Sequence, residues 1–281
     1  MPGIEPEILA HYRMTDEGVR LERAHGRLER ARTQELLVRH LPDGPARILD
    51  VGGGTGVYAR WLAGLGHTVH VVDPVPDHVA QVVDPPTDGV TATIGDARRL
   101  DAADASVDAV LLLGPLYHLT ERTDRVRALA EARRVVRPGG PVIAAAISRF
   151  AALLDGLSGG ALGDPAFAAG AAVTTATGQH RNGTDNPDYF TTAYFHHPDE
   201  LLPELADAGL EPRARYGIEG PGYWYPDLDE RLDDPDRAAL VVQAARTLES
   251  EPTTIGISSH LLAVGQRPSP ATGGVSRQSE R

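Results

Sequence analysis

Short apolar runs alternate with amphipathic stretches through most of this chain, and that alternation predicts its main elements. The runs at 47–51, 70–73 and 90–94 have the length of strands, and a helix-like stretch lies between the first two. Residues 106–113 are almost continuously apolar between polar flanks, which predicts a central strand buried on both faces. Strands of this kind joined by helices favour an α/β fold with a parallel sheet.

The second half of the chain continues this pattern. Residues 121–136 carry Val126, Leu129, Ala130 and Val135 among arginines and acids, which predicts an amphipathic helix. A Pro-Gly-Gly turn at 138–140 ends that helix. The other predicted elements are a strand at 142–147, a helix at 197–210 and strands at 211–216 and 257–264.

The glycine-rich turn after the first strand separates two kinds of nucleotide site. A dinucleotide fingerprint G-x-G-x-x-G that starts at Gly52 would need glycine at position 57, which is Val57. A fingerprint that starts at Gly54 fails at Ala59. The spacing that fits is D-x-G-x-G-x-G from Asp50 to Gly56, in which alternate backbone positions can adopt unusual dihedrals or approach a ligand closely.

This loop, followed by a second strand that ends in Asp73, resembles motif I of the class I S-adenosylmethionine-dependent methyltransferases of small-molecule type. Gly95-Asp96-Ala97 after the third strand and the exit 114–119 after the fourth resemble further segments of that family, so the resemblance covers about residues 45–265. It implies a Rossmann-like, seven-stranded, mostly parallel sheet with helices on both faces, an N-terminal helical arm and a helical lid insertion.

The resemblance also implies roles for individual residues. The loop would wrap the amino-acid end of S-adenosylmethionine, Asp73 would accept hydrogen bonds from both ribose hydroxyls, and Asp96 would take the adenine amino group. The cofactor-binding candidates are Tyr12, Arg27, Asp50, Gly52, Gly53, Gly54, Asp73, Pro74, Gly95, Asp96, Ala97, Leu113 and Gly114.

The activity implied is in-line transfer of a methyl group to an O, N or C nucleophile of a small organic molecule, which leaves S-adenosylhomocysteine. The first candidate for a general base is His118, because the exit of the fourth strand adjoins the methyl position in this fold and imidazole titrates near neutral pH. Candidates to orient the acceptor are Tyr117, Tyr189, His196 and Tyr223. The alternatives are a cofactor-binding scaffold or regulator without catalysis, and an NAD-dependent oxidoreductase.

Three regions outside the predicted sheet would determine the choice of substrate. The first is the arm at 1–44, in which Tyr12, Arg20 and Arg27 are candidates to contact the cofactor carboxylate or a substrate anion. The second is an insertion at 149–195, which is too long for a simple turn and predicts a helical lid. The third is a Pro- and Gly-rich loop at 217–236 with three consecutive aromatics. The remaining divisions are a cofactor-binding half at 45–148, a second half of the core at 196–265 and a disordered tail at 266–281.

Composition narrows the functional class. The chain has 281 residues and no cysteine, which excludes disulfides and thiolate chemistry. Its formal charge of -12 argues against a nucleic-acid substrate, because phosphate backbones require a cationic surface. No apolar stretch approaches the roughly 20 residues that span a bilayer. We expect a bacterial, cytoplasmic protein, monomeric or homodimeric, with no membrane contact and no catalytic metal, since the adjacent histidines 196–197 point to opposite sides of an extended segment.

Overall fold

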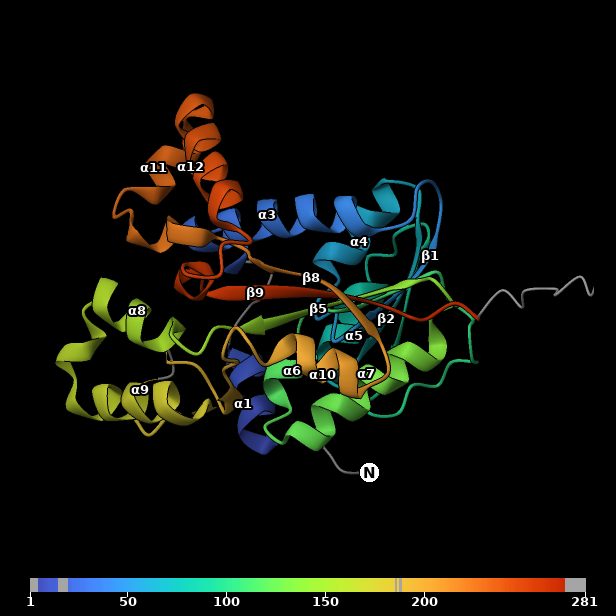
Figure 1. The fold of residues 1–281 in the computed structure, drawn as a ribbon, viewed down its shortest axis with the longest axis horizontal. Coiled ribbons are helices and arrows are strands. Elements are labelled where there is room, and N and C mark those ends of the chain that lie inside the picture. Colours follow the sequence, from blue (N-terminus) through green and yellow to red (C-terminus); the bar gives the residue numbers. More distant parts are fainter. Residues whose placement is uncertain (1–4, 15–19, 185, 187–188, 271–281) are drawn as a thin grey trace, which may run out of the picture.

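The computed structural model describes residues 5–14, 20–184, 186 and 189–270, apart from the side chains of Pro6, Met14, Ala24, Tyr223 and Trp224. Its centre is a seven-stranded sheet in the order β3-β2-β1-β4-β5-β9-β8 (Figure 1). The strands are β1 (Arg47–Val51), β2 (Thr68–Asp73), β3 (Val90–Ile94), β4 (Ala109–Leu112), β5 (Pro141–Ile147), β8 (Glu211–Gly217) and β9 (His260–Gln266). The first five run parallel and β9 is antiparallel to both of its neighbours, which confirms the predicted fold class.

Helices cover both faces of the sheet because successive residues of central strands such as β4 and β5 are apolar and point to opposite sides. Ile48 packs with α3 and α4 on one face, and Leu49 packs with α7 and α10 on the other (Figure 1). The covering helices are α3 (Ala24–His40), α4 (Val57–Gly64), α5 (Pro76–Val83), α7 (Arg122–Val135) and α10 (Leu201–Asp207). Among the described helices, none is both long enough and apolar enough to cross a membrane.

Two further groups of elements extend from the sheet. The predicted lid contains α8 (Ala151–Ser158), η1 (Ala161–Gly163) and α9 (Pro165–Thr177), followed by a hairpin of β6 (Gln179–His180) and β7 (Ala193–Tyr194). The region between β8 and β9 contains η2 (Gly220–Trp224), α11 (Leu228–Asp233), α12 (Pro235–Leu248) and η3 (Ile255–Ile257). The N-terminal arm contributes α1 (Pro6–Met14), and α6 (Pro115–His118) follows β4.

The structure differs from the sequence expectations at several places, and the helix expected at 197–210 is the shorter α10. The fourth strand begins at Ala109, because the Asp108 carboxylate bonds the backbone N–H of Arg47 at the entry to the sheet. The expected aromatic loop at 217–236 is largely helical, since α11 and α12 pack Leu228 and Val241 against Leu28 of α3. The last strand starts three residues late, after the turn η3, and extends into the start of the expected tail. Residues 271–281 of that tail lie outside the described residues.

Candidate functional site

The carboxyl ends of the parallel strands meet at one edge of the sheet, where a cavity of about 290 Å³ opens. Ligands of open α/β sheets bind at this edge, and the volume is near the lower end of the roughly 300–1,000 Å³ usual for small-molecule sites. Side chains of α1 and α3 contribute to its wall. The predicted cofactor residues that line it are Tyr12, Asp50, Gly52, Gly53, Gly54, Asp73, Pro74, Asp96, Ala97, Leu113 and Gly114.

The loop after β1 has a backbone that only glycine adopts readily. Gly52, Gly54 and Gly56 have φ values of 69°, 55° and 80°, in the left-handed region where a Cβ is strained. A Cβ on Gly54 would meet no protein atom within 4 Å, so it would project into the open cavity. The loop is therefore a cradle in which the glycines leave room for a ligand against the backbone.

Asp50 is buried beneath this loop without a hydrogen-bond partner. The residue is 1% exposed, and neither carboxylate oxygen bonds any group in the described part of the chain. Burial, with a smaller contribution from the Asp73 carboxylate, raises the pKa of Asp50 to about 7. A buried acceptor without a donor is costly, so a bound cation or N–H donor would stabilise it.

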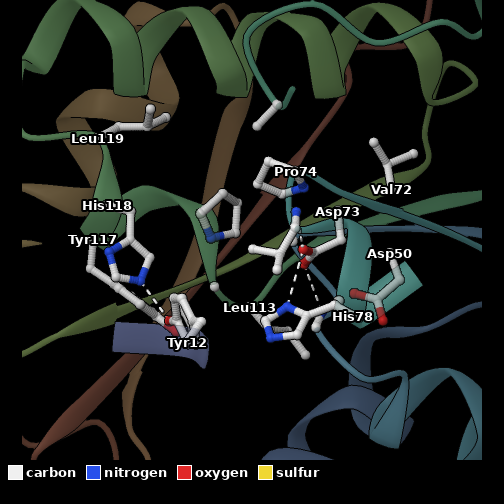
Figure 2. A pocket seen from close by; sticks show the side chains of 18 of the residues that line it. Tyr12, Asp50, Val72, Asp73, Pro74, His78, Leu113, Tyr117, His118 and Leu119 are labelled. Carbon is white, nitrogen blue, oxygen red and sulfur yellow. Dashed lines mark hydrogen bonds and ion pairs between the residues drawn. The ribbon is translucent and has the colours of Figure 1, made fainter. Parts of the chain in front are cut away.

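Asp73 ends β2 and fastens the glycine loop. Its Oδ2 accepts the N–H of Gly54 at 2.9 Å, and its Oδ1 accepts the N–H of Val75 at 2.9 Å. His78 Nδ1 lies 3.2 Å from the same Oδ1, and Figure 2 shows the two side chains pointing toward each other. A carboxylate offers about four acceptor sites, so these three partners leave one for a ligand, and a second ligand bond requires a partner such as His78 to move.

Asp96 follows β3 and is held by a neighbouring arginine. Its carboxylate accepts the backbone N–H of Arg98 at 2.8 Å and pairs with the guanidinium at 2.7 Å. Burial alone would raise the pKa of Asp96, but the bonds from Arg98 outweigh burial and lower it. Asp96 is therefore an ionised acceptor with a fixed orientation at the cavity wall.

His118 lies at the end of α6, across the cavity from Asp73 and His78 in Figure 2. The Tyr12 hydroxyl is 2.6 Å from Nε2, and Nδ1 is 3.4 Å from the carbonyl oxygen of Thr192. Because a carbonyl only accepts, Nδ1 carries the proton and Nε2 accepts from Tyr12. Burial lowers the pKa of His118 to about 4, which keeps the ring neutral at physiological pH.

Comparisons with known proteins agree with this geometry. A family model described as a methyltransferase domain matches residues 48–140, from β1 to the turn before β5. That range contains the glycine loop, Asp73, Asp96 and His118. This chain carries a class I S-adenosylmethionine-dependent methyltransferase domain.

Two curated relatives and one solved structure show how far the likeness extends. An uncharacterized methyltransferase of Mycobacterium tuberculosis (strain ATCC 25618 / H37Rv) is 38% identical over 100 residues, 36% of this chain and 39% of the relative. A malonyl-[acyl-carrier protein] O-methyltransferase of Methylococcus capsulatus is 35% identical over 119 residues, 40% of this chain and 42% of the relative. The chain thus spans about two-fifths of the length of these relatives. A putative Haloferax volcanii methyltransferase, solved with the activator Trm112, shares the fold at a TM-score of 0.59 and 20% identity, over 95% of this chain and 100% of that one.

S-adenosylmethionine is the cofactor of this methyltransferase domain, and the residues present fit it. The open side of Gly54 gives the ligand room beside the backbone, and Asp50 supplies a carboxylate that lacks a donor. Asp73 and Asp96 are acceptors at the ends of neighbouring strands. Each matches a cationic or N–H/O–H group of the cofactor.

The methyltransferase cavity has a second wall, most of which the sequence analysis did not single out. Among its residues, His78 follows β2, Tyr58 lies on α4, Glu29 and Thr33 lie on α3, and His260 begins β9. Of this wall, only Arg20 was a sequence candidate, and it pairs with Glu29 at 2.6 Å. A polar residue at the start of the last strand was the available signal for His260, because an antiparallel strand has its amino end beside the carboxyl end of β5. The strand was expected to start at 257, however, which places His260 in its interior.

Several sequence candidates are not among the residues that line the cavity. Arg27 pairs with Asp233 of α11 at 2.8 Å, on another face of α3 from Glu29. Gly95 packs so closely that a Cβ would lie 2.6 Å from Val72, which gives that glycine a packing role.

Two of the residues expected to orient the acceptor, Tyr189 and His196, are also not among the cavity-lining residues. Tyr189 packs against Phe167 of α9, with the two rings tilted by 55° and their centroids 4.6 Å apart. His196 is fully buried, with Nε2 at 3.2 Å from Glu204, where Arg125 also binds. Of the acceptor candidates whose side chains are described, only Tyr117 lines the cavity, and the Tyr223 side chain lies outside the described part.

Proposed function

We propose that this protein transfers the methyl group of S-adenosylmethionine to an O, N or C atom of a small organic acceptor. The observation that carries the proposal is a single cavity that joins the glycine loop to an opposite wall of ionisable and aromatic side chains. The loop provides the cofactor end of that cavity, and Tyr117, His118 and His260 provide groups that can bind a second molecule.

Bound S-adenosylmethionine would supply a methyl group already activated on a sulfonium sulfur, so the protein mainly has to orient the acceptor and exclude water. Asp50 would pair with the α-ammonium, Asp73 would accept from the ribose hydroxyls and Asp96 from the adenine amino group. Tyr12 on α1 would cover the site, because its hydroxyl connects the arm to His118.

His118 is the proposed proton acceptor for a nucleophile that must lose a proton. The ring is neutral, so Nε2 carries a lone pair that can accept a proton. In this structure that lone pair accepts a hydrogen bond from the Tyr12 hydroxyl. A proton from the acceptor therefore reaches His118 either through the Tyr12 hydroxyl or after Tyr12 moves away. Tyr117, whose ring contacts His118 at a centroid distance of 4.7 Å, would pack against the acceptor.

A small acceptor fits the charge of the protein. The net charge of -12 opposes a polyanionic nucleic acid, and the cavity itself is lined by more carboxylates than guanidinium groups. The name of the Methylococcus capsulatus relative specifies O-methylation, which supports oxygen as one candidate for the methylated atom. A cytoplasmic location and a monomeric or homodimeric state remain predictions.

Calorimetric titration with S-adenosylmethionine, S-adenosylhomocysteine and NAD tests the cofactor. We expect the first two to bind and NAD to bind weakly or not at all; preferential NAD binding would refute the proposal. Incubation with methyl-labelled cofactor and a panel of phenols, amines and carboxylates then distinguishes transfer from a scaffold role. Label transferred to one class of acceptor would identify the nucleophile.

A further inference from the structure

The cavity wall formed by α3 and the last two strands contains a cluster of charged side chains from distant parts of the sequence. His260 begins β9, Glu219 follows β8, and Glu29 lies on α3. Their nearest ligand-type atoms all lie within 4.8 Å of one another. The neighbouring Arg20 pairs with Glu29, so the cluster holds two carboxylates, one guanidinium and one imidazole.

Glu219 holds the His260 ring in one orientation. The carboxylate is 1% exposed and accepts the Ser258 hydroxyl at 2.7 Å and the backbone N–H of His260 at 3.0 Å. Its second oxygen accepts a short hydrogen bond from His260 Nδ1. A buried carboxylate bound to one imidazole nitrogen fixes the ring and leaves the other nitrogen to act.

That other nitrogen, Nε2, has no hydrogen-bond partner among the described residues, although the ring lines the cavity. Among the described residues, Nε2 is also not one of the buried side-chain atoms that lack a hydrogen-bond partner, so this unpartnered nitrogen is accessible to solvent or a ligand. The Glu219 carboxylate therefore holds the ring of His260 and leaves one imidazole nitrogen open to the cavity beside the glycine loop.

Two of the three histidines that line the cavity, His118 and His260, are held in opposite protonation states. Burial would lower the pKa of His260, but the charges of Glu29 and Glu219 outweigh burial and raise it to about 9. His118 has no comparable carboxylate contact, and burial lowers its pKa to about 4. At neutral pH, His260 Nε2 is thus an N–H donor, whereas His118 is a neutral ring. Such a difference in pKa between two titratable groups of one site is typical of groups with different roles.

A metal ion at the same cluster is the competing interpretation. A metal ligand must be a neutral imidazole, whereas His260 is charged and its Nδ1 already binds Glu219. Glu29 is also occupied, because Arg20 bonds both of its oxygens. The bonds of the described groups satisfy this cluster without a cation.

We propose that His260, positioned by Glu219, orients the methyl acceptor by donating its Nε2–H to an oxygen of that molecule. This inference rests on the proposed methyl transfer and specifies the acceptor class as one that carries a hydrogen-bond-accepting oxygen, such as a carboxylate or carbonyl. Since the bond withdraws electron density from the oxygen it holds, the methylated atom is a neighbouring one, such as the second oxygen of a carboxylate.

The test uses protein loaded with S-adenosylhomocysteine and two probes of similar size, benzoate and benzylammonium. Benzoate offers only accepting oxygens, and benzylammonium offers only N–H donors. Nuclear magnetic resonance of protein labelled with ¹⁵N-histidine follows the imidazole of His260 directly. We expect saturable benzoate binding at least tenfold tighter than benzylammonium binding, with a shift at His260 Nε2 and a loss of affinity as the pH rises above about 9.

Variants separate this role from a merely structural one. His260→Ala and His260→Gln should each weaken benzoate binding at least tenfold, and Glu219→Gln should lower the titration midpoint of His260. His70→Ala is the matched control, because His70 lies on β2, bonded to Thr91 and Thr93, and is not among the cavity-lining residues. It should leave benzoate affinity unchanged.

The outcomes distinguish this inference from the proposed function. If wild-type protein does not bind S-adenosylhomocysteine, the proposed function fails. If it binds that product but benzoate binds no better than benzylammonium, binds equally well to the His260 variants, or does not bind, the role of His260 is refuted while the cofactor site stands. Stoichiometric Zn²⁺ binding at pH 7 that is lost in His260→Ala would also refute it in favour of a metal site.

Discussion

The Tyr12 hydroxyl lies 2.6 Å from Nε2 of His118, so a side chain of the N-terminal arm is bonded to the residue that ends α6. Figure 2 shows this contact at one side of the cavity, with Asp73 and His78 at the other. The arm is therefore part of the site, and the nitrogen that would act as a base is covered by α1.

His118→Ala should lower turnover roughly 100-fold or more if the imidazole takes a proton, since general bases contribute about 10²–10⁴-fold. Affinity for S-adenosylhomocysteine should change little, because the carboxylates proposed to bind it belong to Asp50, Asp73 and Asp96, outside α6. With a pKa of about 4, the ring stays neutral down to that pH, so activity should fall only as the solution approaches pH 4. Steady-state rates with an identified acceptor and calorimetry check both parts. Retained turnover would leave His118 with a structural role.

Asp50→Asn should remove a pH dependence of cofactor binding. The Asp50 pKa of about 7 means that the free protein binds a proton there below neutral pH, and a bound ammonium would expel it. Affinity should therefore rise with pH up to about 7 and then level off, with proton release on binding. Calorimetry at pH 6 and pH 8 in buffers of different ionisation enthalpy measures this release. The idea fails if the wild type and Asp50→Asn give the same profile.

The same substitution should stabilise the free protein at high pH. The folded pKa of Asp50 is raised from 3.8 to about 7, so ionisation costs stability as the pH rises through that interval. Each pKa unit corresponds to about 1.4 kcal/mol, and Asp50→Asn should raise the free energy of unfolding by a few kcal/mol above pH 7. Denaturant unfolding at pH 4 and pH 8 checks this, because the gain should be absent at pH 4.

Asp73→Ala should weaken cofactor binding by on the order of 2–4 kcal/mol, through loss of charge-assisted bonds to the ribose. Some of that loss will come from the glycine loop, because Asp73 also holds the N–H of Gly54. Calorimetric titration with S-adenosylhomocysteine measures the effect. Asp77→Ala, an exposed acid in the first turn of α5, is the control and should bind normally. Unchanged affinity in Asp73→Ala would remove this residue from the site.

Gly54→Val should abolish cofactor binding. The residue has a φ of 55°, and its Cβ would enter the open cavity. Gly64→Val is the matched comparison, because a Cβ there also meets no atom within 4 Å, while Gly64 ends α4 outside the cavity-lining residues. The control should bind S-adenosylhomocysteine like the wild type. Normal binding by Gly54→Val would place the ligand elsewhere.

The fold class and the glycine-loop side of the cavity were predictable because their signals are local. A strand, a glycine turn and a strand-end acid lie within 47–73, and each imposes its own backbone geometry. Positions such as Gly52, Asp73 and Asp96 line the cavity because parallel strands bring their carboxyl ends to one edge. The long insertion likewise predicted helices, which α8 and α9 confirm.

The residues on the acceptor side of the cavity could not be predicted in this way, because their positions depend on contacts between segments that are distant in the sequence. His196 looked available in the sequence, but it is fully buried against Glu204, which also binds Arg125, and it is not among the cavity-lining residues. His260 had no motif, yet chain folding places Glu219 on its Nδ1.

The sequence alone thus determined the fold class and the glycine loop, because the strand and helix periods and the glycine dihedrals follow from short-range sterics and apolar pattern. Only the tertiary structure decided which histidines face the cavity and which of them are charged. Those properties depend on burial and on carboxylates from α3 and from the segment after β8, which lie close to His260 in space and far from it along the chain.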